Sequence, residues 1–342
     1  MPKISVVTAV YNGAKFLPET IGSILAQTFS DLEYILVDDA SSDSSVEVIH
    51  SFQDPRIRLL VNDTNSRLVQ TRNRGIGAAR GQYIALSDHD DISVPTRLAD
   101  QVRFLEANPD IGMVGTWYGV INLTGDKLPK RMHRRYDPDE CKVSLLYRNP
   151  FGNSTLLIRR EALPDPPYAP EFPLCEDYRF IVRVSRKHRI AILPKVTVYY
   201  RVTKSSYSNF TRTQTFELAK TIKLELLREL GVEPSERELD IHQNLEMDHL
   251  PPNRSLLAET RHWLERLVAA NEHSRVYDPR AFATITGNEW FERCRTYSHL
   301  GPQVWTEFRR SPLAQRSHYE RLERLKLRLK CMLGGLLPPY SR

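Results

Sequence analysis

The chain has 342 residues, of which 41% are hydrophobic and 26% are charged. This length and composition exclude a disordered chain and allow a sizeable core, and two domains are expected. The formal net charge of +6 favours acidic partners, such as nucleotides, anionic lipid head groups or nucleic acid.

The cysteines and the apolar runs bear on the compartment. The four cysteines are scattered without a C-x-x-C pair, so we predict neither a zinc site nor a disulfide framework, and reduced thiols in the cytosol are the default. The first apolar run stops at Tyr11 and is too short for a secretory signal. No run approaches the ~20 apolar residues of a membrane span, so any membrane contact is expected to be peripheral.

Strand and helix patterns alternate along the first part of the chain. Apolar and β-branched runs predict strands at 4–10, 32–37, 57–62 and 83–87. Helical spacing predicts helices at 17–27, through Val46, Ile49 and Phe52, and at 69–79, and Ser42 or Asp43 can cap the second of them. This order predicts an α/β fold with a mostly parallel sheet.

Carboxylates directly follow two of the predicted strands. Asp38 and Asp39 end the strand at 32–37, and Asp88, Asp90 and Asp91 follow the strand at 83–87. Ligands of open α/β sheets bind at this end of the strands. Three neighbouring acids repel one another unless positive charge lies among them, and a divalent cation with a phosphate-bearing substrate supplies that charge. The alternative is a capped turn.

Five motifs resemble one family. They are Val6-Val7-Thr8-Ala9-Val10-Tyr11-Asn12-Gly13, Ser23-Ile24-Leu25-Ala26-Gln27-Thr28, Leu36-Val37-Asp38-Asp39-Ala40-Ser41-Ser42-Asp43, Arg72-Asn73-Arg74-Gly75-Ile76 and Asp88-His89-Asp90-Asp91. In order and spacing they resemble family 2 glycosyltransferases of the GT-A fold, over roughly the first two-thirds of the chain. The resemblance implies a Rossmann-like sheet with helices on both faces. It also implies an inverting transferase that uses a nucleotide-diphospho-sugar, commonly a UDP-sugar, with Mg²⁺ or Mn²⁺.

The resemblance assigns the residues that bind the donor. Asp39 is expected to accept a hydrogen bond from the imide N–H of a uracil, and the backbone around Ala9 and Tyr11 is expected to line the base. Arg72 is expected to reach the diphosphate as a charged donor. For Asp38 and Asp39 the alternative is to cap the next helix.

The metal site follows from the same resemblance. Asp90 is expected to be the principal metal ligand, and Asp88 to contact the ribose or a water on the metal. Asp91 is expected to support them as an acceptor. His89 stands where the family often has a small residue, and both a phosphate contact and a partly exposed loop position stay open. Arg74 is expected to be solvated or structural.

The next segments are expected to form the acceptor side. We predict a helix within 92–105, a strand at 113–121 and a basic surface loop at 127–135. Residues 151–160 resemble the strand that crosses under the acceptor site in this family. The loop either aids solubility or holds an anionic acceptor or diphosphate. Glu176 and Asp177 are expected at the start of a helix. They either take part in catalysis or only pair with the positive end of the helix dipole. The resemblance makes Asp177 the base that deprotonates the acceptor hydroxyl, and Glu176 the group that orients it.

One position departs from the family. A histidine commonly follows the arginine of the closing segment by two residues, but Thr203 stands there after Arg201. Arg201 or Lys204 is expected to substitute by binding phosphate directly. The departure makes metal dependence less secure than the use of a nucleotide-sugar.

Helical spacing replaces the strand pattern after residue 209. We predict a catalytic domain over 1–209 and a helical domain over 210–342, in which Ser235 and Glu238 form a capping box. The last predicted helix, 313–333, carries an apolar stripe among basic residues, and the spacing of the stripe continues beyond the helix. The stripe consists of Leu322, Leu325, Leu329, Met332 and Leu336. This stripe can lie on an anionic membrane, or dock onto the domain or a second subunit.

The sequence therefore predicts an inverting glycosyltransferase that transfers a sugar to a hydroxyl of a glycan or lipid-linked acceptor in cell-surface polysaccharide assembly. It is expected in the cytoplasm, with peripheral contact to the inner face of the membrane or a homo-oligomer through the last helix. The alternative is a non-catalytic protein of the same fold that binds nucleotide-sugars or glycans. Nucleic-acid binding is not expected, because the basic residues lack interleaved aromatics.

Overall fold

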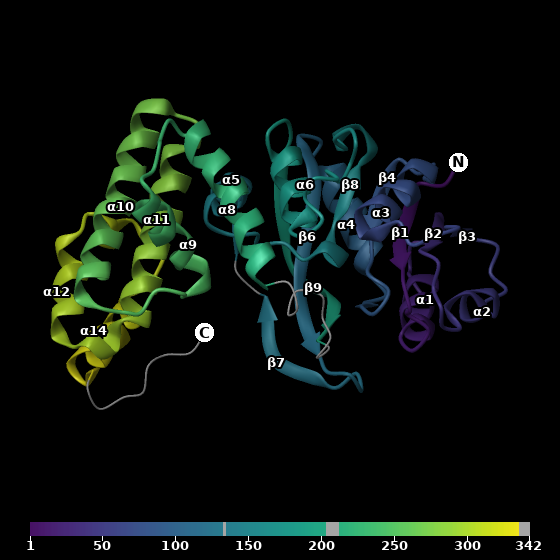
Figure 1. Ribbon diagram of the computed structural model, residues 1–342, viewed down its shortest axis with the longest axis horizontal. Coiled ribbons are helices and arrows are strands. Elements are labelled where there is room, and N and C mark those ends of the chain that lie inside the picture. Colours follow the sequence, from purple (N-terminus) through teal and green to yellow (C-terminus); the bar gives the residue numbers. More distant parts are fainter. Residues whose placement is uncertain (133–134, 203–211, 335–342) are drawn as a thin grey trace. The chain divides into compact units, whose positions relative to one another are not determined.

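The computed structural model describes residues 1–132, 135–202 and 212–334 (Figure 1). By its internal contacts the chain divides into two compact units. The first comprises Met1–Cys141 and Pro150–Ala219, and the second comprises Lys142–Asn149 and Lys220–Arg342. The end of helix α5 (Pro138–Tyr147) therefore belongs to the second unit, which the sequence did not predict. The predicted boundary at residue 209 stays a prediction.

The described part of the first unit holds one nine-stranded sheet. Its strands are β1 (Ile4–Val10), β2 (Leu32–Asp38), β3 (Ile57–Val61), β4 (Tyr83–Leu86), β5 (Ile92–Ser93), β6 (Ile111–Ile121), β7 (Lys127–Met132), β8 (Leu157–Arg159) and β9 (Arg189–Arg201). The strand order is β3-β2-β1-β4-β8-β6-β9-β5, and β7 pairs with β6. The helices are α1 (Leu17–Leu25), α2 (Ser45–His50), α3 (Arg67–Ala78), α4 (Arg97–Ala107) and α6 (Glu176–Ser185), with 3-10 turns at Asn153–Thr155 and Arg160–Ala162. The predicted α/β class is confirmed.

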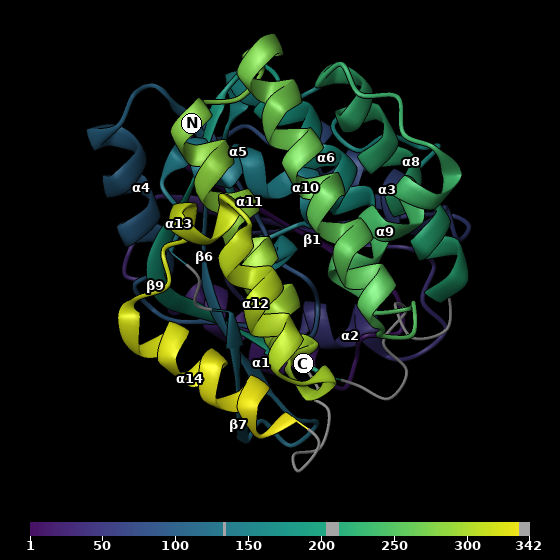
Figure 2. The ribbon, with the colours of Figure 1, turned by 90° about the vertical axis from the view of Figure 1, so that its left-hand side faces the viewer.

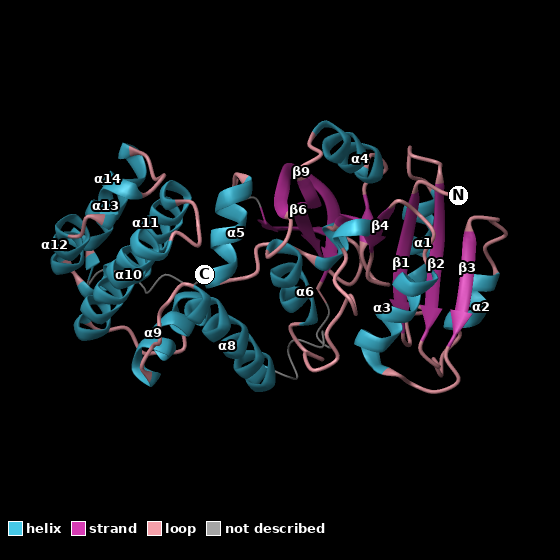
Figure 3. Cartoon of the chain, turned by 90° about the horizontal axis from the view of Figure 1, so that it is seen from above, coloured by secondary structure: helices cyan, strands magenta, loops and turns pink. Residues whose placement is uncertain are grey.

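The sheet has a parallel part and a mixed part. Strands β1 to β4 pair only in parallel with one another, and Figure 3 shows β1, β2 and β3 running in the same direction. Strands β5 to β9 add four antiparallel pairings and one parallel pairing, β6 with β9. The prediction of a mostly parallel sheet therefore holds for the first four strands. Their carboxyl ends meet at one edge, which is where the predicted acids lie.

Helices cover both faces of the parallel strands. On one face Ile4, Val6 and Val10 of β1 belong to a core that α1, α2 and α4 complete. On the other face α3 lies so close that a Cβ at Gly75 would stand 2.5 Å from Val7 and 3.0 Å from Val37. The close approach places Arg72 of α3 near the carboxyl ends of β1 and β4.

Three predicted segments take a different form. Residues 92–93 form β5 against β9, and the helix predicted after Pro95 begins at Arg97. Residues 127–132 form the edge strand β7, where we predicted a loop because the segment lacks apolar alternation. The pairing of β7 with β6 shifts its register between Gly119 and Val120, and Pro129 lies in the corresponding stretch of β7. Proline has no backbone N–H to donate, and it is tolerated in a strand at the edge of a sheet. Of the strand predicted at 151–160, only Leu157–Arg159 is a strand.

The second unit is helical. Besides the end of α5 it contains α8 (Arg212–Glu229), α9 (Glu236–Met247), α10 (Arg254–Ser274), α11 (Pro279–Thr296), α12 (Pro302–Arg310), α13 (Leu313–Arg316) and α14 (Arg321–Met332), of which α8 begins in the first unit. The Ser235–Glu238 capping box is confirmed. The single helix predicted at 313–333 is wrong, because the chain breaks it between Arg316 and Arg321. Within the described residues we find no helix with the length and apolarity needed to cross a membrane.

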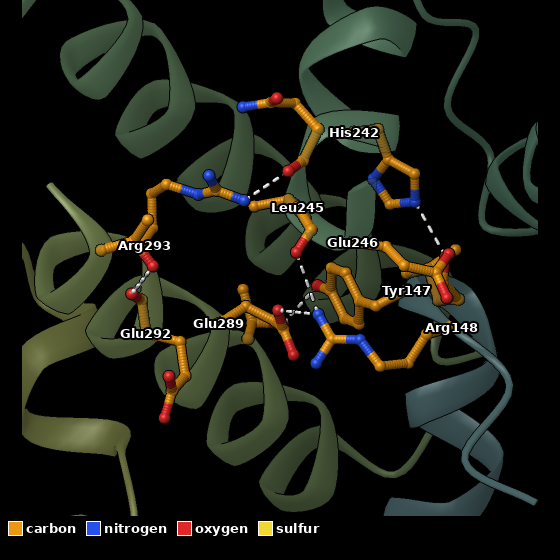
Figure 4. A network of polar contacts seen from close by, with 12 residues as sticks. Tyr147, Arg148, His242, Leu245, Glu246, Glu289, Glu292 and Arg293 are labelled. Atoms are coloured by element: carbon orange, nitrogen blue, oxygen red, sulfur yellow. Dashed lines mark hydrogen bonds and ion pairs between the residues drawn. The ribbon is translucent and has the colours of Figure 1, made fainter. Parts of the chain in front are cut away.

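A buried polar network joins α5, α9 and α11 inside the second unit (Figure 4). Arg148 donates to Glu289 at 2.6 Å, and Tyr147 and Thr286 share a hydrogen bond of 2.8 Å. His242, fully buried, bonds the carbonyl of Leu146 at 2.8 Å through Nε2, while its Nδ1 accepts from Trp263. Burial lowers the pKa of His242 to about 3. This histidine is therefore neutral and structural.

Candidate functional site

The loops at the carboxyl ends of β1 and β2 are tied together. Asn12, in the left-handed region at φ 50°, accepts from the Ser42 amide at 2.8 Å. Its own amide donates to Ser41 at 3.0 Å, and the Gly13 amide donates to Ser45 at 2.9 Å. The pairing of Ala9 with Val37 of β2 holds the backbone before this loop, and Tyr11 within the loop is 48% exposed.

Asp39 and Asp38 use their carboxylates differently. Asp39 accepts from Asn62 at 2.6 Å, from the Ser66 amide at 2.8 Å and from the Arg67 amide at 2.9 Å, so it caps α3 rather than the next helix. Among the described residues, the Oδ2 atom of Asp39 accepts one hydrogen bond, from the Arg67 amide, which leaves accepting capacity for a ligand. Asp38 accepts from Ser41, and its buried Oδ1 has no partner among the described residues.

Arg72 joins two of the predicted motifs. Its Nη2 donates to Asp88 at 2.6 Å and its Nη1 donates to Glu176 at 2.6 Å, although Glu176 lies 104 residues further along the chain. The guanidinium also stacks over Tyr168, with 5.3 Å between Cζ and the ring centroid. Burial alone would lower the pKa of Arg72, but the charges of Asp88 and Glu176 raise it. Arg72 is thus a permanent cation shared between two carboxylates.

The acids after β4 have unequal surroundings. Burial would raise the pKa of Asp88, but Arg72 holds it below its usual value. Asp88 also accepts from Asn153 at 2.9 Å. For Asp90, burial and then the charge of Asp88 raise the pKa, while His89 opposes them. No neighbouring side chain donates to the Asp90 carboxylate in the described ranges, so Asp90 is the acid that a bound cation would stabilise.

Two buried arginines, Arg97 and Arg201, donate hydrogen bonds to backbone carbonyls of the Leu86–Asp91 segment. Arg97, fully buried, donates to the carbonyls of Leu86 and Leu156, and burial lowers its pKa to about 10. Arg201, 1% exposed, donates to the carbonyl of Asp90 at 2.9 Å and to Glu19 at 2.6 Å. These bonds occupy the Arg201 guanidinium. We therefore revise its predicted contact with phosphate to a role in positioning the Asp88–Asp91 loop.

Glu176 and Asp177 begin α6, as predicted. Cys175 in the left-handed region, at φ 61°, turns the chain into this helix. Burial and then the neighbouring charge of Glu176 raise the pKa of Asp177 to about 7. A carboxylate with this pKa accepts a proton readily near neutral pH, as a general base must.

Several residues near these acids were not predicted. Tyr118 of β6 and Tyr200 of β9 have ring centroids 6.0 Å apart. Burial and then Asp177 raise the pKa of Tyr118, and burial and then Asp91 raise that of Tyr200, so the two phenols lie within electrostatic range of acids from separate motifs. Asn153 also belongs here. The sequence predicts Phe151–Asn153 as part of a strand, and nothing in its pattern indicates that Asn153 donates to Asp88.

The remaining predicted residues have separate outcomes. His89 is half-buried, and a Cβ at Gly13 would stand 2.7 Å from its ring, so this histidine packs against the first loop. Arg74 donates to the carbonyl of Val61 at 2.7 Å, in keeping with a structural role. Thr203 and Lys204 lie outside the described residues.

The acids brought together fit a hard divalent cation. Mg²⁺ and Mn²⁺ commonly take one or two protein carboxylates and complete their shell with phosphate oxygens and water. Asp90 meets this requirement, and Asp88 meets it in part because Arg72 and Asn153 already engage one of its oxygens. Across the described ranges, no group of three or more His, Cys, Asp or Glu side chains is placed to hold a metal by itself.

Known proteins resemble the chain in sequence. Residues 5–165 match glycosyl transferase family 2. An uncharacterized glycosyltransferase of Haemophilus influenzae is 30% identical over 251 residues, which cover 68% of this chain and 76% of the relative. A UDP-Glc:alpha-D-GlcNAc-diphosphoundecaprenol beta-1,3-glucosyltransferase, WfaP of Escherichia coli, is 34% identical over 106 residues, which cover 31% of this chain and 42% of WfaP.

A solved structure resembles the fold. Staphylococcus aureus TarS, in complex with UDP-GlcNAc, gives a TM-score of 0.55 at 17% sequence identity and covers 99% of this chain and 93% of that one. At this identity the likeness concerns the fold alone. Together, the match to the family, the relative from Haemophilus influenzae and this fold show that the chain belongs to glycosyltransferase family 2 and has the fold predicted from its motifs.

Proposed function

We propose that the protein is an inverting glycosyltransferase that moves a sugar from a nucleotide-diphospho-sugar, a UDP-sugar, to a hydroxyl of a glycan or lipid-linked acceptor. The observation that carries the proposal is the double contact of Arg72 with Asp88 and Glu176. It brings the acids after β4 and the acids that begin α6 to one place. Inverting transfer needs both a site for the diphosphate and a base for the acceptor.

The donor side uses the first two loops. Ala9 and Tyr11 lie at the end of β1, whose loop is bonded to the Ser41–Ser45 segment, and Asp39 begins the β2 loop. We assign Ala9 and Tyr11 to the base, and Asp39 Oδ2 to its imide N–H. Both terminal nitrogens of Arg72 already hold the acids, so we replace its predicted role as a hydrogen-bond donor to the diphosphate by attraction through its positive charge alone.

Mg²⁺ or Mn²⁺ fits the donor set at Asp90, with Asp88 next to it. When bound, the cation would neutralise charge on the departing diphosphate. Burial and then the charge of Asp88 raise the pKa of Asp90, and a cation bound at this carboxylate would compensate its negative charge. The protein also contributes the Arg201 bond that holds the Asp90 backbone.

The acceptor side uses Asp177 and the tyrosines. We assign Asp177 as the base that takes the proton of the acceptor hydroxyl, with Glu176 holding Arg72 beside it. Tyr118 and Tyr200 present aromatic faces, which bind the apolar faces of sugar rings well. Tyr200 is 38% exposed and is therefore accessible to an acceptor.

The relatives support the biological setting. WfaP carries in its name a UDP-sugar donor and a lipid-linked diphosphate acceptor. We extend this to a role in cell-surface polysaccharide assembly on the cytoplasmic face of a membrane. The alternative, a non-catalytic sugar-nucleotide-binding protein of the same fold, would not require an acid with a pKa near neutrality beside the bridging arginine.

The test combines a donor panel with one substitution. The purified chain is incubated with UDP- and GDP-sugars, in EDTA and then with Mn²⁺, and nucleotide release is measured. We expect turnover only with the cation and a drop of about a thousandfold in kcat for Asp177→Asn, with the Kd for the donor within about twofold. Unchanged turnover in Asp177→Asn would refute the assigned base. Donor binding without turnover in both proteins would favour the non-catalytic alternative.

A further inference from the structure

Helix α14 exposes an apolar stripe to solvent. Leu322, Leu325, Leu329 and Met332 are 60%, 48%, 50% and 53% exposed, and Leu333, which follows the helix, is 48% exposed. At 3.6 residues per turn these side chains share one face of the helix. We predicted that the stripe would lie on a membrane or dock onto a protein surface. The structure shows no docking of these leucines among the described residues, and Leu336 lies outside them.

The opposite face of α14 fixes the helix to its unit. Leu327 and Cys331 are 1% and 0% exposed, and α14 packs against α12 (Figure 2). Arg324 donates to the carbonyl of Tyr319 at 3.0 Å, and Tyr319 stacks on Phe291 with 3.9 Å between ring centroids. The exposed stripe is therefore presented by a helix that already has its own buried side.

Basic residues border the stripe on both sides. By helical position, Arg321 and Arg328 lie along one border, and Lys326 and Lys330 lie along the other. Arg321, Lys326 and Arg328 are exposed. The only acid in α14 is Glu323, which pairs with Lys326 at 2.7 Å. Long basic side chains at the borders of an apolar face can reach lipid phosphates while the leucines enter the acyl region.

We propose that α14 lies on an anionic lipid bilayer, with its leucine stripe inserted and its two basic borders on the head groups. A second copy of the chain fits this face less well. In a side-by-side pair of α14 helices, each basic border would face a basic border of the other copy, and like charges at close range are unfavourable. An anionic bilayer matches both the stripe and the borders. The proposal goes beyond glycosyl transfer and does not depend on it.

Vesicle flotation of the full chain tests the proposal. We expect the protein to float with vesicles of phosphatidylglycerol and phosphatidylcholine and not with phosphatidylcholine alone. Leu325→Gln/Leu329→Gln is expected to lower the partition coefficient at least about tenfold, because each leucine loses the free energy of burial in the acyl region. Arg321→Gln/Arg328→Gln is expected to lower it several-fold, and the loss should shrink in high salt.

Matched controls separate the helix from general surface effects. Arg310→Gln removes an exposed cation of the same unit, and Leu123→Gln removes a leucine that is 40% exposed in the first unit; neither should change flotation. Absence of flotation, or flotation that the Leu325/Leu329 variant leaves unchanged, would overturn the proposal. A dimer in sedimentation that the same variant dissociates would replace it with a protein contact. Transfer to a soluble acceptor should be the same in all variants, so failure here leaves the proposed function intact.

Discussion

The polar network of the helical unit and the acids at the end of the sheet differ in how their charges are balanced. In the helical unit, cations face single carboxylates: Arg148, which is half-buried, lies 2.6 Å from Glu289, and Lys223, which is fully buried, lies 2.6 Å from Glu246. At the end of the sheet, Arg72 is shared by two acids, while burial raises the pKa of Asp90 and of Asp177. Removing one partner of a buried ion pair destabilises a fold, because it leaves the other charge uncompensated. An excess of acids, in contrast, remains available for a positively charged ligand or for a proton.

The same contrast appears for histidine and aspartate. His242 has both ring nitrogens occupied, and burial lowers its pKa to about 3, so it remains neutral at physiological pH. Asp177 changes its charge near pH 7. A buried titratable group is therefore structural when its partners hold one protonation state, and it is a functional candidate when they leave both states accessible.

The largest effect is expected from breaking a pair in the helical unit. Arg148→Leu removes the cation beside Glu289, which is 4% exposed, and should lower the free energy of unfolding by about 3–5 kcal/mol. Urea unfolding at pH 7 measures this change. The double variant Arg148→Leu/Glu289→Leu should recover much of the loss, since both charges are gone. A single variant as stable as the wild type would show that the network is not structural.

A smaller effect, on turnover, is expected from Arg72→Lys. One ammonium group cannot hold both Asp88 and Glu176 at 2.6 Å, so the two acids should lose their alignment. We expect kcat to fall about a hundredfold, with less loss of stability than in Arg148→Leu. Arg74→Lys on the same helix is the control and should keep full turnover. Equal effects of the two variants would contradict the bridging role of Arg72.

The pH dependence should report Asp177. A base must be ionised, so kcat/KM should fall as pH drops below about 7, by about tenfold per pH unit. Stability should show the opposite trend. The folded pKa of Asp177 lies above its unfolded value, so the folded state binds the proton more tightly and loses stability as pH rises toward 7. Asp177→Asn should remove this part of the pH dependence of unfolding. If kcat/KM does not fall below about pH 7, Asp177 is not the base.

The smallest effect is expected from the aromatic pair. Tyr200→Leu keeps an apolar side chain but removes the ring that faces Tyr118 at 6.0 Å. We expect KM for the acceptor to rise several-fold, about 1 kcal/mol in binding, while KM for the donor stays unchanged. Initial rates at varied acceptor concentration measure this split. A change in the donor KM alone would indicate that Tyr200 contacts the donor and not the acceptor.

Local pattern predicted much of the first unit. The strand predicted at 4–10 is confirmed, and the strand predicted at 32–37 extends by one residue to Asp38. Glu176 begins a helix as expected, because apolar runs and helical spacing are properties of neighbouring residues. The strand β7 was missed because its pairing with β6 supplies the order that its own sequence lacks. The break after Arg316 was missed because residues 317–320 contain neither Gly nor Pro, the residues that most often mark the end of a helix.

By itself, the sequence determined the fold class, the family and the acids at the strand ends, because each of these rests on residue types at short and regular spacing. Only the tertiary structure decided that Arg72 meets Glu176 across 104 positions, that Arg201 is buried behind Asp90, and that the leucines of α14 face solvent. The physical reason is that charge pairing and burial depend on which distant segments pack together. Spacing along the chain does not record that packing.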